Sequence, residues 1–233
     1  MTYNLSSADP VGMSFWLISM ALVAATVFFF IERDRVAGKW KTSLTVSGLV
    51  TLIAAVHYFY MRDVWVSTGT SPTEFRYIDW LLTVPLLMVE FYLVLSAVTK
   101  VPARVFWKLL LGSIVMLGFG YYGEVSGAGT TAATIGFIGG MAGWLYIVNE
   151  IFRGEAHQIN AGLSNANVQK AYKWMLICVS IGWSIYPIGY AIGYLGGGAD
   201  PAMLNIVYNL ADFVNKIAFG VIIWSAAVAD SEA

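Results

Sequence analysis

The chain has 233 residues, of which 58% are hydrophobic and only 12% are charged. Because a soluble domain carries about 25% charged residues, this composition excludes an ordinary soluble globular protein and favours one that resides in a lipid bilayer. The net charge of −1 gives no basis for a nucleic-acid partner.

Apolar windows of about 20 residues, the length that crosses a bilayer, recur along the whole sequence. The connectors between them are short, so we expect one domain over residues 1–233, an all-α membrane protein whose helices form an antiparallel bundle. The seven predicted transmembrane helices span about 11–31, 43–61, 75–98, 105–122, 131–152, 172–195 and 202–229.

Lysine and arginine are concentrated in the connectors on one side of this predicted bundle. By the positive-inside rule, that side faces the cytoplasm, so we expect the N-terminus outside and the C-terminus in the cytoplasm. The opposite connectors hold a single basic residue, Arg62. The ten basic residues of the cytoplasmic side are Arg33, Arg35, Lys39, Lys41, Lys100, Arg104, Lys108, Arg153, Lys170 and Lys173.

The third predicted helix, 75–98, carries several polar side chains on one face. Thr83 follows Asp79 by one turn. Glu90 follows Asp79 by eleven residues, which is about three turns plus 20° and about 16 Å along the helix axis. Arg76 lies one turn to the outer side of Asp79. These residues therefore form an ordered series across the membrane.

The last predicted helix, 202–229, contains Lys216, with Asp212 one turn before it. A charged amine at the centre of a membrane costs about 3 kcal/mol on insertion scales. Such a lysine is explained either by a buried ion pair or by a covalent bond to a carbonyl compound, since lysine forms Schiff bases.

Together these charges describe a path for a proton. With the predicted orientation, Asp79 and Asp212 lie on the outer side of Lys216, and Glu90 lies on the cytoplasmic side. Burial favours the neutral form of a carboxylic acid unless a cation compensates, so we expect the outer pair to be ionised and Glu90 to be protonated. The alternative is an ion-pair network that only joins helices, which would not need the lone acid Glu90.

Three stretches carry a resemblance to a known family: RYIDWLLTVPLLMVEFYL (76–93), WSIYPIGY (183–190) and YNLADFVNK (208–216). Through them the chain resembles the microbial rhodopsins and, among these, the green-absorbing proteorhodopsins. The resemblance implies that all-trans retinal is bound covalently to Lys216 as a protonated Schiff base, and it implies no metal site.

The resemblance also implies a role for each charged residue of the path. Asp79 matches the primary proton acceptor and counterion, and Asp212 matches the second counterion carboxylate. Glu90 matches the cytoplasmic proton donor, and Arg76 matches the arginine that steadies the counterion complex. The set Asp79, Thr83 and Glu90 accompanies outward proton pumps in this family.

The implied function is therefore a light-driven ion transporter, not an enzyme, that moves protons across a bacterial cytoplasmic membrane. The alternative is a sensory rhodopsin of the same fold, which would signal to a transducer. Such sensors often lack a carboxylic donor, so the presence of Glu90 favours the pump.

His57 matches a histidine that bonds to the acceptor carboxylate in proteorhodopsins, where it would tune the pKa of Asp79. On sequence alone, a histidine on an apolar helix face is more often a core residue. The family also forms rings of five or six protomers, in which this histidine meets a tryptophan of a neighbouring protomer. Trp16 is the matching residue, so the resemblance implies a homo-oligomer, a pentamer or hexamer, through Trp16 and His57.

The residues that match the retinal pocket are mostly large and aromatic. They are Trp80, Thr83, Leu87, Trp144, Trp183, Tyr186 and Tyr190. Trp183 and Tyr186 are three residues apart and share a helix face; without the resemblance this stripe would indicate core packing. Gly140 and Gly143 in the fifth helix more often serve helix packing, and a second, carotenoid chromophore stays an open alternative.

Leu87 occupies the position that acts as a colour switch in this family, where leucine accompanies green absorption and glutamine accompanies blue. A polar side chain there alters the ground and excited states of the polyene differently. We therefore expect green absorption from the wild type and a shift to blue in Leu87→Gln. Visible spectra of both proteins with retinal test this, and an unshifted variant would contradict the assignment.

Overall fold

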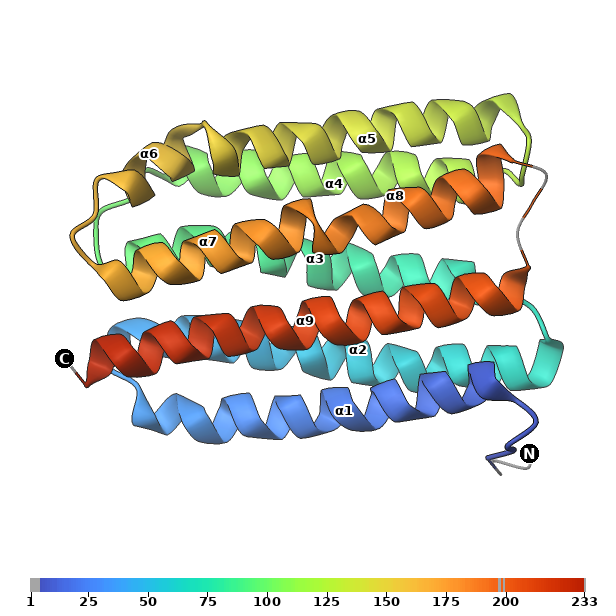
Figure 1. Cartoon of the computed structure of the whole chain (residues 1–233), viewed down its shortest axis with the longest axis horizontal. Helices are drawn as coiled ribbons and strands as arrows, with labels where there is room; N and C mark the ends of the chain where they lie inside the picture. The colour runs from blue at the N-terminus through green and yellow to red at the C-terminus, as the bar shows by residue number, and fades with distance from the viewer. Residues whose placement is uncertain (1–4, 197, 199, 233) are drawn as a thin grey trace.

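The computed structural model describes residues 5–196, 198 and 200–232. The other positions of the predicted domain lie outside this description. The described part is helical throughout its regular elements, and seven of its helical segments are long and apolar enough to cross a membrane. This confirms the predicted fold class. In Figure 1 the segments run side by side as one bundle, and α1 begins at the end opposite to the one where α9 ends.

The long segments are built from α1 (Pro10–Glu32), α2 (Lys41–Thr68), α3 (Thr73–Ser96), α4 (Ala103–Val125), α5 (Thr131–Phe152), α7 (Ala166–Ser180), α8 (Ile185–Tyr190) and α9 (Pro201–Ser231). The shorter elements are η1 (Arg33–Arg35), η2 (Gly38–Trp40), α6 (Glu155–Ala161), η3 (Gly182–Ser184) and the π-helical turn η4 (Ala191–Leu195).

Local side-chain chemistry sets where the helices begin and end. Asp9 and Asp200 accept hydrogen bonds from backbone N–H groups in the first turns of α1 and α9. Each is followed by a proline at the first helical position, where the missing N–H is not needed. Gly69, with φ of +67°, ends α2 in the left-handed conformation. The helix therefore continues to Thr68, past the predicted end near residue 61.

The sixth predicted helix, 172–195, is interrupted. It begins earlier, at Ala166, and is broken after Ser180 by the 3-10 turn η3 before α8 resumes. Pro187 provides the reason, because a proline has no N–H for the carbonyl one turn earlier and its ring crowds that carbonyl. The break separates α7 from α8 at the level of the buried polar centre.

The distribution of side chains is inverted relative to a soluble protein. Leu17, Ile138 and Leu210 are 66%, 63% and 59% exposed on the outside of the bundle. Asp79 and Lys216, in contrast, are 0% and 3% exposed. A bundle with apolar side chains outward and ionisable side chains inward is matched to surrounding lipid.

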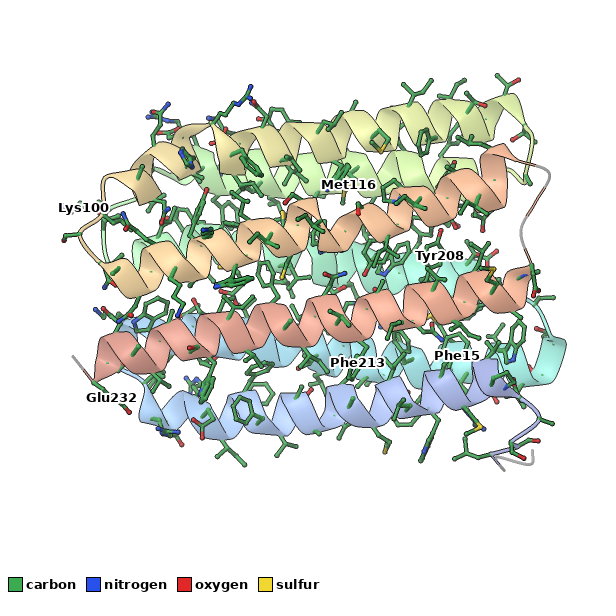
Figure 2. The ribbon with its side chains drawn as sticks, in the orientation of Figure 1. Phe15, Lys100, Met116, Tyr208, Phe213 and Glu232 are labelled. Carbon is green, nitrogen blue, oxygen red and sulfur yellow. The ribbon has the colours of Figure 1, made fainter. Side chains whose placement is uncertain are left out.

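The helices form a closed ring. Neighbours along the chain pack from α1 to α5, α7 packs on α9, and α9 returns to pack on α1 and α2. The connectors that hold most of the basic residues lie at the end of the bundle where the chain ends. Figure 2 shows Lys100 and Glu232 at this end.

The backbones of α4 and α5 approach closely at a glycine. A Cβ atom built on Gly143 would lie 2.8 Å from the Cα and N atoms of Met116, so only glycine permits this approach. Gly118 lies on α4, as Met116 does, but a Cβ atom built on it would face open space. The contact agrees with the packing role expected for Gly143.

We expect Gly143→Ala to lower the stability of the bundle, because overpacking costs about 1–3 kcal/mol. Gly118→Ala is the matched control and should be neutral or slightly stabilising, by up to about 1 kcal/mol, since alanine is the better helix former. Thermal denaturation of both variants in one detergent, followed by circular dichroism, measures the difference. A Gly143→Ala midpoint equal to or above that of the control would refute the packing argument.

Candidate functional site

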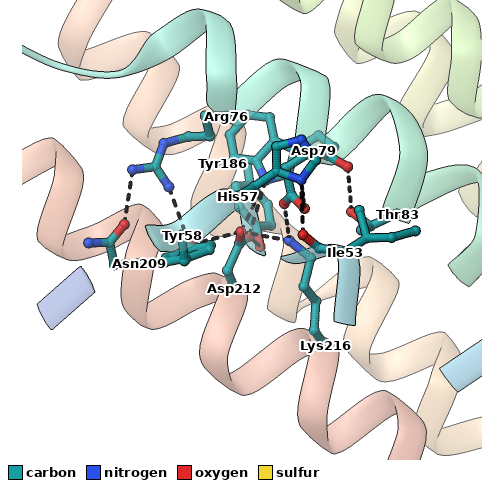
Figure 3. A network of polar contacts seen from close by, with 11 residues as sticks. Ile53, His57, Tyr58, Arg76, Asp79, Thr83, Tyr186, Asn209, Asp212 and Lys216 are labelled. Carbon is teal, nitrogen blue, oxygen red and sulfur yellow. Dashed lines mark hydrogen bonds and ion pairs between the residues drawn. The ribbon is translucent and has the colours of Figure 1, made fainter. Parts of the chain in front are cut away.

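Lys216, near the middle of α9, forms a buried centre with two carboxylates. Its Nζ donates to Asp79 Oδ2 at 2.6 Å and to Asp212 Oδ2 at 2.7 Å (Figure 3). The three side chains are at most 3% exposed. The structure thus brings together the amine and the two acids that sequence analysis placed near one another, with Asp79 contributed by α3 and the other two by adjacent turns of α9.

The two carboxylates are held differently. Asp212 accepts hydrogen bonds from Tyr58 Oη at 2.9 Å, from Tyr186 Oη at 2.7 Å and from Trp80 Nε1 at 3.2 Å. Asp79 accepts from the lysine alone, and among the described residues its Oδ1 has no hydrogen-bond partner. Because donors stabilise the charged form of a carboxylate, the surroundings favour the anion of Asp212 more than that of Asp79.

Polar side chains of α2 and α9 orient Arg76. Its Nη2 donates to Asn205 Oδ1 and to Asn209 Oδ1, each at 2.9 Å. Its Nη1 donates to Tyr58 Oη at 3.3 Å. Figure 3 shows the contacts of Arg76 with Asn209 and Tyr58. The guanidinium carbon also lies 5.5 Å from the centroid of the Tyr208 ring, within cation–π range. Arg76 is thus connected to the carboxylate centre through the hydroxyl of Tyr58.

Sequence analysis did not identify Asn205. It lies two turns before Asp212 on α9, and its polar neighbours along the helix are Asn209, Asp212 and Lys216. The spacing of four, three and four residues puts all of them on one helix face. This spacing was visible in the sequence and could have identified Asn205 as part of the site.

His57 approaches Asp79 without forming the expected hydrogen bond. Its Nδ1 lies 2.9 Å from the carbonyl oxygen of Ile53 and 3.7 Å from Asp79 Oδ1, a separation longer than a hydrogen bond. The imidazole is therefore hydrogen-bonded within its own helix, α2, and only lies close to the acid.

Trp16 is 38% exposed on α1 and packs against Phe59 of the same chain. The contact between Trp16 and the His57 of another protomer stays a prediction.

Glu90 is fully buried in the half of α3 nearer the basic connectors. Ser47 Oγ, from α2, donates to its Oε1 at 3.3 Å, whereas Oε2 has no partner among the described residues. Ser47 was missed by sequence analysis, because its role depends on which residue of another helix it faces. The Ser43 side chain also lies beside this carboxyl group. A carboxyl group that has only hydroxyls and no cation beside it, among the described residues, is less costly to bury when it is protonated.

A cavity lies beside Lys216 and is bounded by α3, α4, α5 and α8. Its wall includes six of the seven residues predicted for the retinal pocket: Trp80, Leu87, Trp144, Trp183, Tyr186 and Tyr190. Thr83 directs its hydroxyl to the backbone carbonyl of Asp79, at 2.9 Å. Sequence analysis missed part of the wall on α4 and α5, including Met116 and Phe137. The cavity suits a long apolar molecule with a polar end at the amine.

Fold and site together define a multi-pass membrane protein with a buried amine–carboxylate centre beside an apolar cavity. The chain belongs to the bacteriorhodopsin-like protein family, whose family model it matches over residues 9–229.

Named relatives span nearly the whole chain. A green-light absorbing proteorhodopsin of the gamma-proteobacterium EBAC31A08 is 58% identical over 98% of this chain and 90% of its own length. A blue-light absorbing proteorhodopsin of the gamma-proteobacterium Hot 75m4 is 57% identical with the same coverage. Because both kinds match almost equally well, overall similarity does not decide the colour.

Solved structures give the same result for the fold. The crystal structure of blue light-absorbing proteorhodopsin from Med12 is 52% identical, covers 95% of this chain and 100% of its own, and superimposes with a TM-score of 0.82. Xanthorhodopsin, described as a light-driven ion pump with dual chromophore, is 29% identical over 98% of this chain and 96% of its own, with a TM-score of 0.85.

Replacing Lys216 by methionine would remove the cation that lies between Asp79 and Asp212. Breaking a buried ion pair costs about 3–5 kcal/mol, so we expect Lys216→Met, purified without added ligand, to denature at a markedly lower temperature than wild type. Adding Asp79→Asn should restore part of the loss, because it removes one of the two opposed charges. Equal midpoints for wild type and Lys216→Met would show that the pair contributes nothing to stability.

Proposed function

We propose that this protein is a light-driven pump that moves protons from the cytoplasm to the outside, with all-trans retinal joined to Lys216 as a protonated Schiff base. The observation that carries the proposal is the position of Lys216 Nζ, which lies beside an apolar cavity and within 2.7 Å of two buried carboxylates. An amine condenses with an aldehyde with loss of water, and the cationic nitrogen formed would keep Asp79 and Asp212 as its counterions.

The relatives support this proposal. The chain shares more than half of its residues with proteins named green-light and blue-light absorbing proteorhodopsins. It also shares its fold with a protein described as a light-driven ion pump. These names concern light absorption and ion movement, and the cavity beside Lys216 is where this chain would hold the light-absorbing group.

The residues around the cavity suit retinal. Its wall is apolar and aromatic, and Trp144 is fixed there by a hydrogen bond from its Nε1 to the carbonyl of Val179 at 3.0 Å. Retinal, when bound, would supply absorption of visible light and an isomerisation that redirects the nitrogen. Bulk water is kept from the centre, since Asp79 and Lys216 are at most 3% exposed.

The carboxylates would then act in a set order. Asp79 has an oxygen without a hydrogen-bond donor, so it would accept the proton from the nitrogen of Lys216. Asp212, held by Tyr58 and Tyr186, would stay ionised. Its negative charge would keep the guanidinium group of Arg76 close to the centre. General acid–base groups of this kind accelerate a proton transfer by about 10²–10⁴-fold.

Glu90 would return a proton to the nitrogen from the other side. It lies on the same helix as Asp79, about 16 Å away along the axis, and it is buried next to Ser47. A protonated acid on the cytoplasmic side and an ionised acid on the outer side would make the transfer directional. Glu90 would then recover its proton from the cytoplasm.

Several finer features belong to the same proposal. Leu87 lines the cavity and is 3% exposed, which supports green absorption. The basic connectors at the end where the chain terminates support a cytoplasmic C-terminus in a bacterial cytoplasmic membrane. The exposed Trp16 supports a ring of five or six protomers, in which it would meet a neighbour's His57.

The function is tested by adding all-trans retinal to the expressed protein and illuminating cells in an unbuffered medium. We expect a coloured protein and acidification of the medium, and a colourless Lys216→Ala variant that leaves the pH unchanged. A protein that forms colour but moves no protons would instead favour the sensory alternative, and a protein that stays colourless would overturn the retinal proposal.

Two variants separate the acceptor from the donor. Asp79→Asn should stop pumping and shift the colour, because it removes a counterion charge. Glu90→Gln should leave the colour almost unchanged and slow the return of the proton to the nitrogen, by about 10²-fold. Flash photolysis with a pH indicator measures both, and normal pumping by Asp79→Asn would exclude it as the acceptor.

A further inference from the structure

An open groove lies on the lipid-facing surface of the bundle, between α4 and α5. Its volume is about 580 Å³, within the range of about 300–1,000 Å³ for ligand sites. Arg104 and Lys108 lie at one end of the groove, and Val115 and Ala142 lie at the other. Among the described residues, none lines both this groove and the cavity beside Lys216. The groove is therefore separate from the proposed retinal site.

Small residues form the floor of the groove. Gly112 belongs to α4, whereas Ala142 and Gly143 belong to α5. A Cβ atom built on Gly112 would lie 3.1 Å from the ring of Tyr146, so the two helices are close together here as they are at Gly143. Larger side chains such as Leu111, which is 54% exposed, stand beside this floor. The result is an apolar depression that a hydrocarbon chain can fill.

The length of the groove matches one leaflet of a bilayer. Arg104 and Val115 are eleven residues apart on α4, which is about 16 Å along the helix axis. One leaflet contributes about 15 Å of hydrocarbon, half of a core about 30 Å thick. The residues of α4 in the groove recur at the spacing of one helix face. They are Arg104, Trp107, Lys108, Leu111, Gly112 and Val115.

Charged side chains lie at the end of the groove near the basic connectors. Arg104 Nε donates to Glu155 Oε2 at 2.7 Å, and Lys108 Nζ lies 3.3 Å from Glu150 Oε2. The Arg104 side chain nevertheless stays 70% exposed. Part of its guanidinium group is therefore accessible to a ligand in the groove.

Positive charge exceeds negative charge at this end. Arg153, directly after α5, and Lys100, before α4, are both exposed. They add to the two cations that line the groove, whereas Glu150 and Glu155 supply two carboxylates. The excess of cations favours a ligand with a net negative charge over a neutral one.

Two further features suit a lipid headgroup at this end. Pro102 occupies the position before α4, and its side chain has no acceptor for the N–H groups of the first turn. The N-terminus of a long helix favours an anion, because it carries a partial positive charge and unpaired N–H groups. Trp107 is 54% exposed in the next turn, and tryptophan is enriched where hydrocarbon meets headgroups.

We propose that this groove binds an anionic phospholipid from the leaflet at the end of the bundle with the basic connectors. The phosphate group contacts Arg104 and the N-terminus of α4, and one acyl chain lies along Leu111 and Val115. Arginine suits this task because its planar group can donate two parallel hydrogen bonds to a phosphate. The site does not depend on the proposed pump function, because the bilayer surrounds the protein in either case.

A second copy of the chain is a less suitable occupant. The proposed contact between protomers uses Trp16 of α1 and His57 of α2. In Figure 1, α1 lies on the other side of the bundle from α4 and α5. The groove would therefore stay open to lipid in the proposed ring.

Native mass spectrometry of the purified full chain tests the headgroup contact. The probes are dioleoyl phosphatidylglycerol, which is anionic, and dioleoyl phosphatidylcholine, which has the same chains and no net charge. We expect phosphatidylglycerol to bind more tightly, and Arg104→Gln to weaken its binding by about 5-fold. Arg35→Gln is the matched control and should have no such effect, since Arg35 is an exposed arginine that pairs with Glu32 next to α1.

A second pair of variants tests the apolar part of the groove. Ala142 is exposed, so Ala142→Phe would fill the groove without disturbing the core and should weaken binding of phosphatidylglycerol. Ala24→Phe is the control, because Ala24 is an exposed alanine on α1. Equal affinities of these two variants would contradict an acyl chain in the groove.

Other results would also overturn the lipid site. Equal binding of the two lipids by the wild type, or equal effects of Arg104→Gln and Arg35→Gln, would exclude a specific anionic lipid. Retention of inorganic phosphate in place of lipid would show a site for a free anion instead. If Arg104→Gln does not fold, Arg153→Gln decides: it should reduce the preference for phosphatidylglycerol, and an unchanged preference would refute the proposal. Binding is measured without illumination, so a failure of the pump proposal would be seen separately.

Discussion

An ammonium group held between two carboxylates, in a region without bulk water, is the interaction on which the rest of this structure depends. Each of these charges would be costly to bury alone, and a buried charge is tolerated when it is paired and hydrogen-bonded. Lys216 and Arg76 supply two positive charges, and Asp79 and Asp212 supply two negative ones, so the centre is formally neutral. Because Asp79 comes from α3 and the lysine from α9, the pair also sets how these two helices align.

The asymmetry between the two carboxylates gives this centre its chemical direction. Asp212 is fixed by three donors from α2, α3 and α8, whereas Asp79 keeps one oxygen without a donor. Two acids at almost equal distance from the same nitrogen therefore have different hydrogen-bond surroundings. In the proposed holoprotein the nitrogen of Lys216 would still carry one positive charge, so the same arrangement of counterions would serve it.

Buried acids on either side of the centre are supported by hydroxyl groups rather than by cations. Glu90 accepts from Ser47, and Glu124 accepts from Tyr77. A lysine or arginine in these positions would hold the acid in its ionised form, whereas a hydroxyl can turn to serve either protonation state. In the proposed pump, such surroundings would let Glu90 gain and lose a proton.

Hydrophobic length and helical periodicity determined much of this protein before any tertiary contact was known. They predicted seven spanning helices, the shared face of Asp79 and Glu90, and the adjacent turns that hold Asp212 and Lys216. These features depend only on spacing within one helix, which the order of residues specifies. The family resemblance added six residues of the cavity wall, including Trp183.

Only the tertiary structure decided which side chains of different helices meet. It placed Ser47 on Glu90, brought Asn205 to Arg76 and held His57 3.7 Å from the carboxylate it was expected to bond. Periodicity shows which way a residue faces on its own helix, but the rotation and axial position of each helix against its neighbours follow from packing of the whole bundle, and these decide the partner.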